Sequence, residues 1–158
     1  MPFYAPFSLG PFNIDAEGRL TPNAPDNPPN FLVRWHNRPV RARMISNDDA
    51  DARLSLQTVL GRVPSSAAIG APGERSHSFE LLRGLRAGLP NPWKLRLLPD
   101  HRAVLEAETQ IALPITAVGL IATVTRFLMA MGPYIELAEE AGFRPVGGQP
   151  PARQPVRA

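Results

Sequence analysis

The sequence predicts a two-layer α+β domain, in which an antiparallel five-stranded sheet carries helices on one face. Every segment with strand character alternates apolar and polar residues, so each strand has one buried and one solvated face, as in antiparallel sheets covered on one side. Two further segments have the three-and-four spacing of amphipathic helices. The expected order is strand, strand, strand, helix, strand, strand, helix.

Composition and proline placement indicate one folded unit with extended ends. The 158 residues suit one domain of roughly 100–200 residues, and 44% apolar residues are enough for a core. Prolines crowd both ends, and proline lacks the amide donor that helices and central strands need. We therefore expect a proline-rich arm over residues 1–30, an α+β domain over 31–143 and a disordered tail over 144–158. Within the arm, residues 12–14 and 19–20 suggest a short hairpin.

The first strands of the sheet are expected over residues 31–36 and 40–44. Apolar residues alternate in both, and a two-residue loop at Asn37-Arg38 would join them as a hairpin. This loop sets Trp35 opposite Val40 on the apolar face. On the other face it sets Arg34 opposite Arg41. Directly opposed like charges weaken a sheet, so an acidic group in this protein or on a partner is expected to compensate them.

The arginine cluster of this hairpin comprises Arg34, Arg38, Arg41 and Arg43. Three interpretations stay open for it: a solvated or internally paired face, an interface for an acidic protein segment or subunit, and a phosphate-binding surface for nucleic acid. Trp35 points to the opposite face and would not stack a base beside the arginines. The net charge of +3 is also modest for a nucleic-acid-binding protein.

Alternation over residues 54–58 predicts a third strand, which should end near residues 61–64. A helix is expected over residues 74–87 and should end at Gly88. The second hairpin, residues 93–97 and 103–111, is expected to fold about His101. That register places Arg96 opposite Glu106 and Lys94 opposite Glu108. A slip of one residue would put charges into the apolar face, so the pattern is expected to specify this single register.

The last helix is expected to begin after Thr116, a potential N-cap, and to form the main cover of the core. Gly132-Pro133 should kink or break it, since a proline ring obstructs the preceding turn, and a second short piece should end at Gly142. Residues 111–131 are long and apolar enough for a membrane span. The interruptions at Pro114 and Arg126 favour a buried helix instead.

Catalytic and metal-binding patterns are missing from the sequence. It has no cysteine, which excludes disulfides, thiolate nucleophiles and cysteine-based metal sites. His36, His77 and His101 lack metal-ligand spacing, and neither a Gly-x-Ser-x-Gly elbow nor a phosphate-binding loop occurs. Glu106 and Glu108 face basic partners that would hold them ionised. We therefore expect no metal, no cofactor and no enzymatic activity.

The element order over residues 31–142 resembles that of the type III secretion chaperone-like fold. The resemblance rests on this order and on residues 105–131, where an alternating strand runs through Leu113-Pro114 into an amphipathic helix. Proteins of this fold often dimerise and bind extended segments of other proteins. The resemblance therefore implies a homodimer with a protein segment or a partner subunit as its ligand.

The sequence thus predicts a non-enzymatic, protein-binding module. Its N-terminus lacks the positive charge and apolar run of a signal peptide, so we expect a cytoplasmic protein, not one in the membrane. The expected partner-binding residues are those of the arginine cluster and of the second hairpin: Arg34, Arg38, Arg41, Arg43, Arg96 and Glu106. The alternative is a nucleic-acid or phospholigand-binding protein that uses the same arginines.

Overall fold

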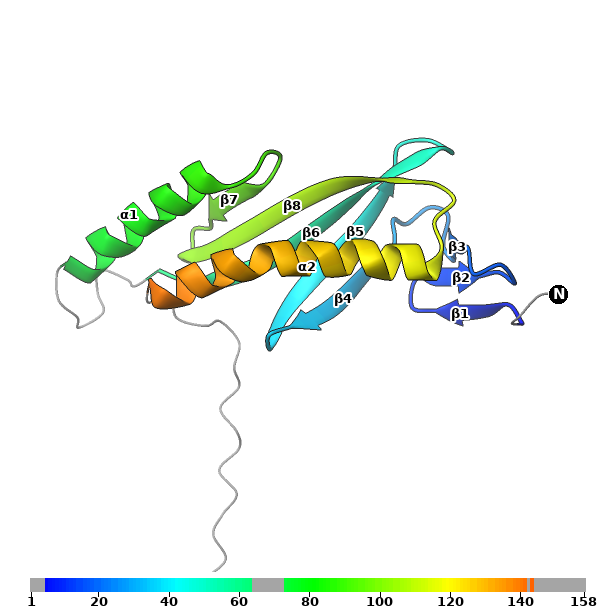
Figure 1. The fold of residues 1–158 in the computed structure, drawn as a ribbon, viewed down its shortest axis with the longest axis horizontal. Helices are drawn as coiled ribbons and strands as arrows, with labels where there is room; N and C mark the ends of the chain where they lie inside the picture. The colour runs from blue at the N-terminus through cyan, green and yellow to red at the C-terminus, as the bar shows by residue number, and fades with distance from the viewer. Residues whose placement is uncertain (1–4, 64–72, 142, 144–158) are drawn as a thin grey trace, which may run out of the picture.

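A five-stranded antiparallel sheet forms the body of the molecule (Figure 1). The computed structural model describes residues 5–63, 73–141 and 143. The strand order in the sheet is β4-β5-β6-β8-β7. The strands are β4 (Asn30–Trp35), β5 (Arg38–Ser46), β6 (Asp51–Arg62), β7 (Lys94–Leu97) and β8 (Arg102–Ala112). The predicted α+β class and antiparallel pairing are confirmed. The structure differs from the prediction in having a second, three-stranded sheet.

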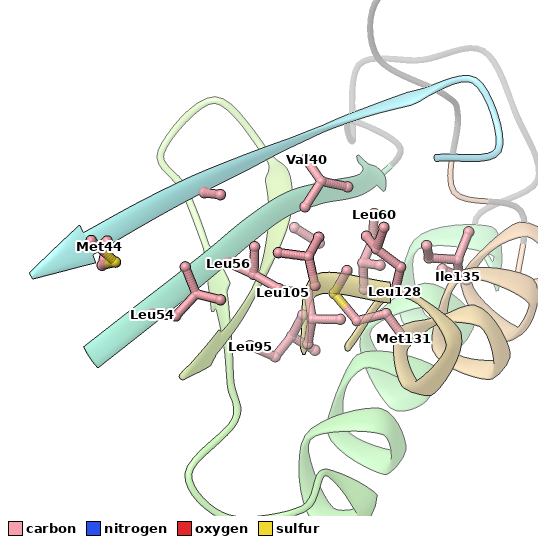
Figure 2. Close-up of a cluster of buried hydrophobic side chains, with 14 of the residues drawn as sticks. Val40, Met44, Leu54, Leu56, Leu60, Leu95, Leu105, Leu128, Met131 and Ile135 are labelled. Atoms are coloured by element: carbon pink, nitrogen blue, oxygen red, sulfur yellow. The ribbon is translucent and has the colours of Figure 1, made fainter. Parts of the chain in front are cut away.

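The core lies between this sheet and two helices, α1 (Gly73–Gly88) and α2 (Ala117–Glu140). Figure 2 shows side chains of β5, β6 and β8 meeting those of α2, among them Leu56, Leu105 and Met131. Leu56, Leu105 and Met131 are at most 1% exposed. Full burial of one such side chain stabilises a fold by about 1.5–3 kcal/mol, so this layer contact is the main stabilising element. We call the sheet surface that faces α2 the buried face and the opposite surface the open face.

A small second sheet precedes the main one. It consists of β1 (Phe7–Leu9), β2 (Phe12–Ile14) and β3 (Leu20–Pro22), paired antiparallel in that order. The hairpin expected within the N-terminal arm is therefore present. Phe12, Ile14 and Leu20 are buried in the same core as α2. The Leu20 amide also donates to the carbonyl of Ile115 at 2.9 Å, which fixes the small sheet beside the start of α2. The expected tail, 144–158, lies outside the described residues.

Asp15 organises the turn between β2 and β3. Its carboxylate accepts the backbone amides of Glu17 (3.0 Å) and Arg19 (2.8 Å) and the Nε of Arg19 (2.7 Å). The backbone hydrogen bond from Arg19 is the largest cause that holds the pKa of Asp15 below its usual value. Gly18 completes the turn with φ at 78°, a region that glycine adopts without strain.

Asp15 is expected to make this turn sensitive to acid. Because its pKa is lower in the folded than in the unfolded chain, its contribution to stability is present above the unfolded pKa, about 3.9, and is lost as pH falls through the folded pKa. Carboxyl-carbon NMR titration should give a midpoint below that of an unfolded Asp. In Asp15→Asn this acid-dependent part should disappear from unfolding curves. A midpoint at or above the unfolded value would contradict the prediction.

The first hairpin of the main sheet turns one residue earlier than the sequence predicts. His36 and Asn37, with φ of 45° and 61°, form the loop, and Trp35 pairs with Arg38. Positive φ at both central residues is the signature of a type I′ turn, whose twist matches that of the strands. The expected pairing of Trp35 with Val40 is therefore wrong by two residues. Since side chains alternate with a period of two, each residue keeps its predicted face.

The second hairpin is shifted in the same way. A three-residue loop, residues 99–101, lets the Leu98 amide donate to the Arg102 carbonyl at 2.8 Å, and His101 takes φ of 66°. A turn followed by a left-handed residue is a common three-residue hairpin connection. Lys94 consequently pairs with Glu106, and Arg96 lies opposite Val104, not opposite Glu106 as expected. Leu95 still faces the core.

α2 continues through Pro133 as one helix, so the predicted break is absent. Thr116 caps the helix as expected: its side chain accepts the Gly119 amide at 3.1 Å. Buried residues occur on both sides of the proline, including Met131 and Ile135, so core packing supports both halves of the helix despite the missing amide. The predicted end at Gly142 lies outside the described residues.

α2 is also the one helix among the described residues that is long and apolar enough to span a bilayer. Core helices share these properties, and the structure uses one side of α2 to cover the sheet.

Candidate functional site

The open face is built from residues that alternate with the core residues along each strand. One row across the sheet consists of Leu32, Arg41, Gln57, Glu106 and Lys94. In the adjacent row, Asn30, Arg43, Ser55 and Glu108 lie side by side. In these rows the basic residues lie on β5 and at Lys94 of β7, and the acidic residues lie on β8.

Three of the predicted arginines form a cluster on the β4–β5 half of the open face. Arg34, Arg41 and Arg43 are exposed there, and we call them the arginine patch. The structure removes the expected like-charge opposition, because Arg34 lies opposite Pro39 and Arg41 opposite Leu32. No acidic side chain among the described residues forms an ion pair with these three arginines. Their positive charge is therefore open to solvent and to a partner.

Arg38, the fourth arginine of the predicted cluster, does not belong to the patch. It is 8% exposed and lies on the buried face. Its guanidinium donates to the carbonyls of Val59 (3.0 Å) and Leu60 (2.6 Å) and to Glu139 of α2 (2.8 Å). The pairing of β6 with β8 skips Leu60 at a β-bulge. The guanidinium of Arg38 donates a hydrogen bond to the backbone carbonyl of this skipped residue. The earlier turn, which moves Arg38 from the loop into β5, is the reason for this difference.

The acidic half of the open face is paired within the protein. Glu106 forms an ion pair with Arg96 and accepts a hydrogen bond from Gln57 Nε2 at 2.9 Å. The ion pair expected between Arg96 and Glu106 is thus present, formed along the diagonal of the ladder and not directly across it. Glu108 pairs with Arg53 at 3.9 Å, not with Lys94 as expected. Arg96 and Glu106 therefore satisfy each other, whereas the arginine patch has no such partner.

The described part of the chain contains no group of three or more His, Asp or Glu side chains placed to hold a metal ion. Sequence reasoning missed two features of the surface. One is the burial of Arg38, which depends on a single residue in the turn. The other is a groove between β8 and α2, which arises because β7 is much shorter than β8. The four-residue length of β7 is visible in the sequence as the short alternating run that follows Pro92.

The sequence matches no protein-family model and no curated protein. The chain is similar in structure to a chain of the heterodimeric ExoU–SpcU complex from the type III secretion system of Pseudomonas aeruginosa. It is 18% identical, the match covers 76% of this chain and 91% of that chain, and the TM-score is 0.40.

Proposed function

We propose that this protein is a binding module, without catalytic activity, whose arginine patch binds an acidic segment or subunit of another protein. The observation that carries the proposal is the uneven pairing of charge on the open face. Glu106 and Glu108 have basic partners within the fold, whereas Arg34, Arg41 and Arg43 have no acidic partner among the described residues.

The chemistry of the patch fits carboxylates. A guanidinium presents several donors in a fixed plane and binds carboxylates through paired, charge-assisted hydrogen bonds. Arg41 and Arg43 alternate along β5, so their Cα atoms lie about 6.8 Å apart. An extended segment places side chains of one face at the same spacing. Leu32, 59% exposed beside Arg41, adds an apolar contact. An extended segment with alternate acidic residues therefore matches the patch in spacing and in charge.

The test is the double substitution Arg41→Glu/Arg43→Glu, with Arg83→Glu/Arg86→Glu on the exposed side of α1 as a control of equal charge change. Fluorescence anisotropy with a labelled Glu-rich peptide should show at least about a tenfold weaker affinity for the patch variant, equivalent to about 1.4 kcal/mol. The control should bind nearly as well as the wild type. Equal losses of affinity in both variants would mean that only the net charge of the protein matters. That result would contradict the proposal.

A second candidate function, binding of nucleic acid or another phosphate ligand, uses the same exposed arginines. Phosphate recognition predicts that the logarithm of affinity falls steeply and linearly with the logarithm of salt concentration. Trp35 argues against base stacking beside the patch, since it packs against the core from the other face. Tighter binding of an oligonucleotide than of the Glu-rich peptide at the same salt concentration would favour this second function.

A further inference from the structure

A groove lies between β8 and α2. Its volume is about 550 Å³, which is within the usual range of small-ligand sites, about 300–1,000 Å³. β7 pairs only with residues 103–106 of β8, whereas β8 continues to Ala112. Figure 1 shows β7 beside one end of β8, with the rest of β8 running on toward the start of α2. The groove therefore lies beside the part of β8 that β7 leaves uncovered.

The walls of the groove are largely apolar. Ile111 of β8, Ile115 of the turn before α2 and Phe127 of α2 supply large apolar side chains. Gly119 and Ala122 of α2 also line the groove, and their small size leaves room beside the helix. The groove can therefore accommodate an apolar chain along the helix.

Arg126 is the one charged residue among those that line the groove. It is exposed and forms no ion pair with any described acidic residue. The residues three and four positions away on α2, which are its neighbours on the helix surface, are Ala122, Thr123, Met129 and Ala130. Glu106 and Glu108 of β8 already have basic partners. The groove therefore combines apolar walls with one available cation.

The position of Arg126 sets the length of a ligand that fits. The chain reverses direction between β8 and α2, so Ile115 and Gly119 lie at one end of the groove and Arg126 at the other. The helical rise from Gly119 to Arg126 is about 10 Å. An extended carbon chain advances about 1.2 Å per bond. A chain of about eight carbons therefore spans the groove.

We propose that this groove binds a medium-chain carboxylate, with its acyl chain against Ile111, Ile115 and Phe127 and its head group at Arg126. Burial of methylene groups against the apolar walls favours the chain. A guanidinium binds a carboxylate through charge-assisted hydrogen bonds, and a single cation matches a head group of one negative charge. The site is separate from the arginine patch on β4 and β5, so the inference goes beyond the proposed function.

Isothermal titration calorimetry of the full chain with unbranched carboxylates, each below its critical micelle concentration, tests the proposal. Affinity should rise by at most about fourfold per added methylene and should level off near about eight carbons. Octanol and octyltrimethylammonium should bind at least about fivefold more weakly than octanoate, because neither pairs with a cation. Equal affinity for the three head groups, or a rise that continues well beyond this length, would indicate general adsorption to apolar surface and overturn the proposal.

Two substitutions locate the ligand. Ala122→Trp fills the groove from an exposed position and should weaken octanoate binding at least about tenfold. Arg126→Gln should weaken octanoate binding at least about fivefold and leave octanol binding unchanged. The matched controls are Ala130→Trp, exposed on α2 outside the lining, and Arg86→Gln, exposed on α1. Both controls should bind octanoate like the wild type.

Unchanged octanoate binding by either groove variant, or an equal loss in its control, would overturn the proposal. So would concentration-dependent self-association of the free chain that Ala122→Trp abolishes, which would assign the groove to a second copy. The Arg41→Glu/Arg43→Glu variant should retain its affinity for octanoate. Failure of the groove and failure of the arginine patch can therefore be told apart.

The two tryptophans supply a readout in the wild-type protein. Trp93 stacks on Phe127 of the groove with ring centroids 5.8 Å apart, whereas Trp35 lies on β4. Octanoate should shift the indole N–H NMR signal of Trp93 and leave that of Trp35 in place. A shift of the Trp35 signal alone, or of neither signal at saturating octanoate, would overturn the proposal.

Discussion

Replacement of Arg38 by methionine is expected to lower the free energy of unfolding by about 2–3 kcal/mol. Methionine retains much of the aliphatic volume but removes the donors to the carbonyls of Val59 and Leu60. Hydrogen bonds from a charged donor contribute about 1.5–3 kcal/mol, and a buried acceptor left without its partner costs about 1–3 kcal/mol. Urea unfolding followed by circular dichroism measures the change.

The matched control for this experiment is Glu139→Gln. The side chain of Glu139 is 56% exposed, so water replaces much of its interaction with Arg38. Exposed ion pairs contribute about 0–1 kcal/mol, and the glutamine variant should lose no more than that. If Glu139→Gln destabilised the protein as much as Arg38→Met, the ion pair and not the bulge carbonyls would be the main role of Arg38.

Truncation of Leu105 to alanine is expected to have the largest effect on stability, a loss of about 2–5 kcal/mol. Leu105 lies on β8, is fully buried, and contributes to the core between sheet and helices (Figure 2). Its removal leaves a cavity that close-packed neighbours fill only in part. Thermal unfolding monitored by calorimetry should show a clearly lower melting temperature.

Leu32→Ala provides the same chemical change on the other side of the sheet. Leu32 lies on the open face and is 59% exposed, so its truncation should change stability by no more than about 0.5 kcal/mol. Comparable losses in both variants would mean that the open face is covered in solution. That result would contradict the assignment of the two faces.

The fold class and the face of each strand residue could be predicted from the sequence because both depend on alternation. An error of one residue in a turn shifts a hairpin register by two and leaves every side chain on its face. Arg41 and Arg43 are therefore on the open face as predicted, although their partners across the sheet differ. The order of elements from β4 to α2 also follows from the local pattern.

Features that depend on long-range contacts could not be predicted in this way. Arg38 seemed to be a loop residue, and only the observed type I′ turn and the β6 bulge place its side chain beside Leu60 and Glu139. The continuity of α2 through Pro133 depends on core contacts on both sides of the proline. Local propensity contains no information about either arrangement.

The central claim is that the arginine patch is the part of the open face available to an acidic partner. Mapping of backbone amide chemical shifts during titration with the Glu-rich peptide tests this most directly. The account predicts changes concentrated at Leu32, Arg34, Arg41 and Arg43, with the amides of Glu106 and Glu108 little affected. Changes centred on β7 and β8, or none at peptide concentrations that saturate the anisotropy signal, would contradict it.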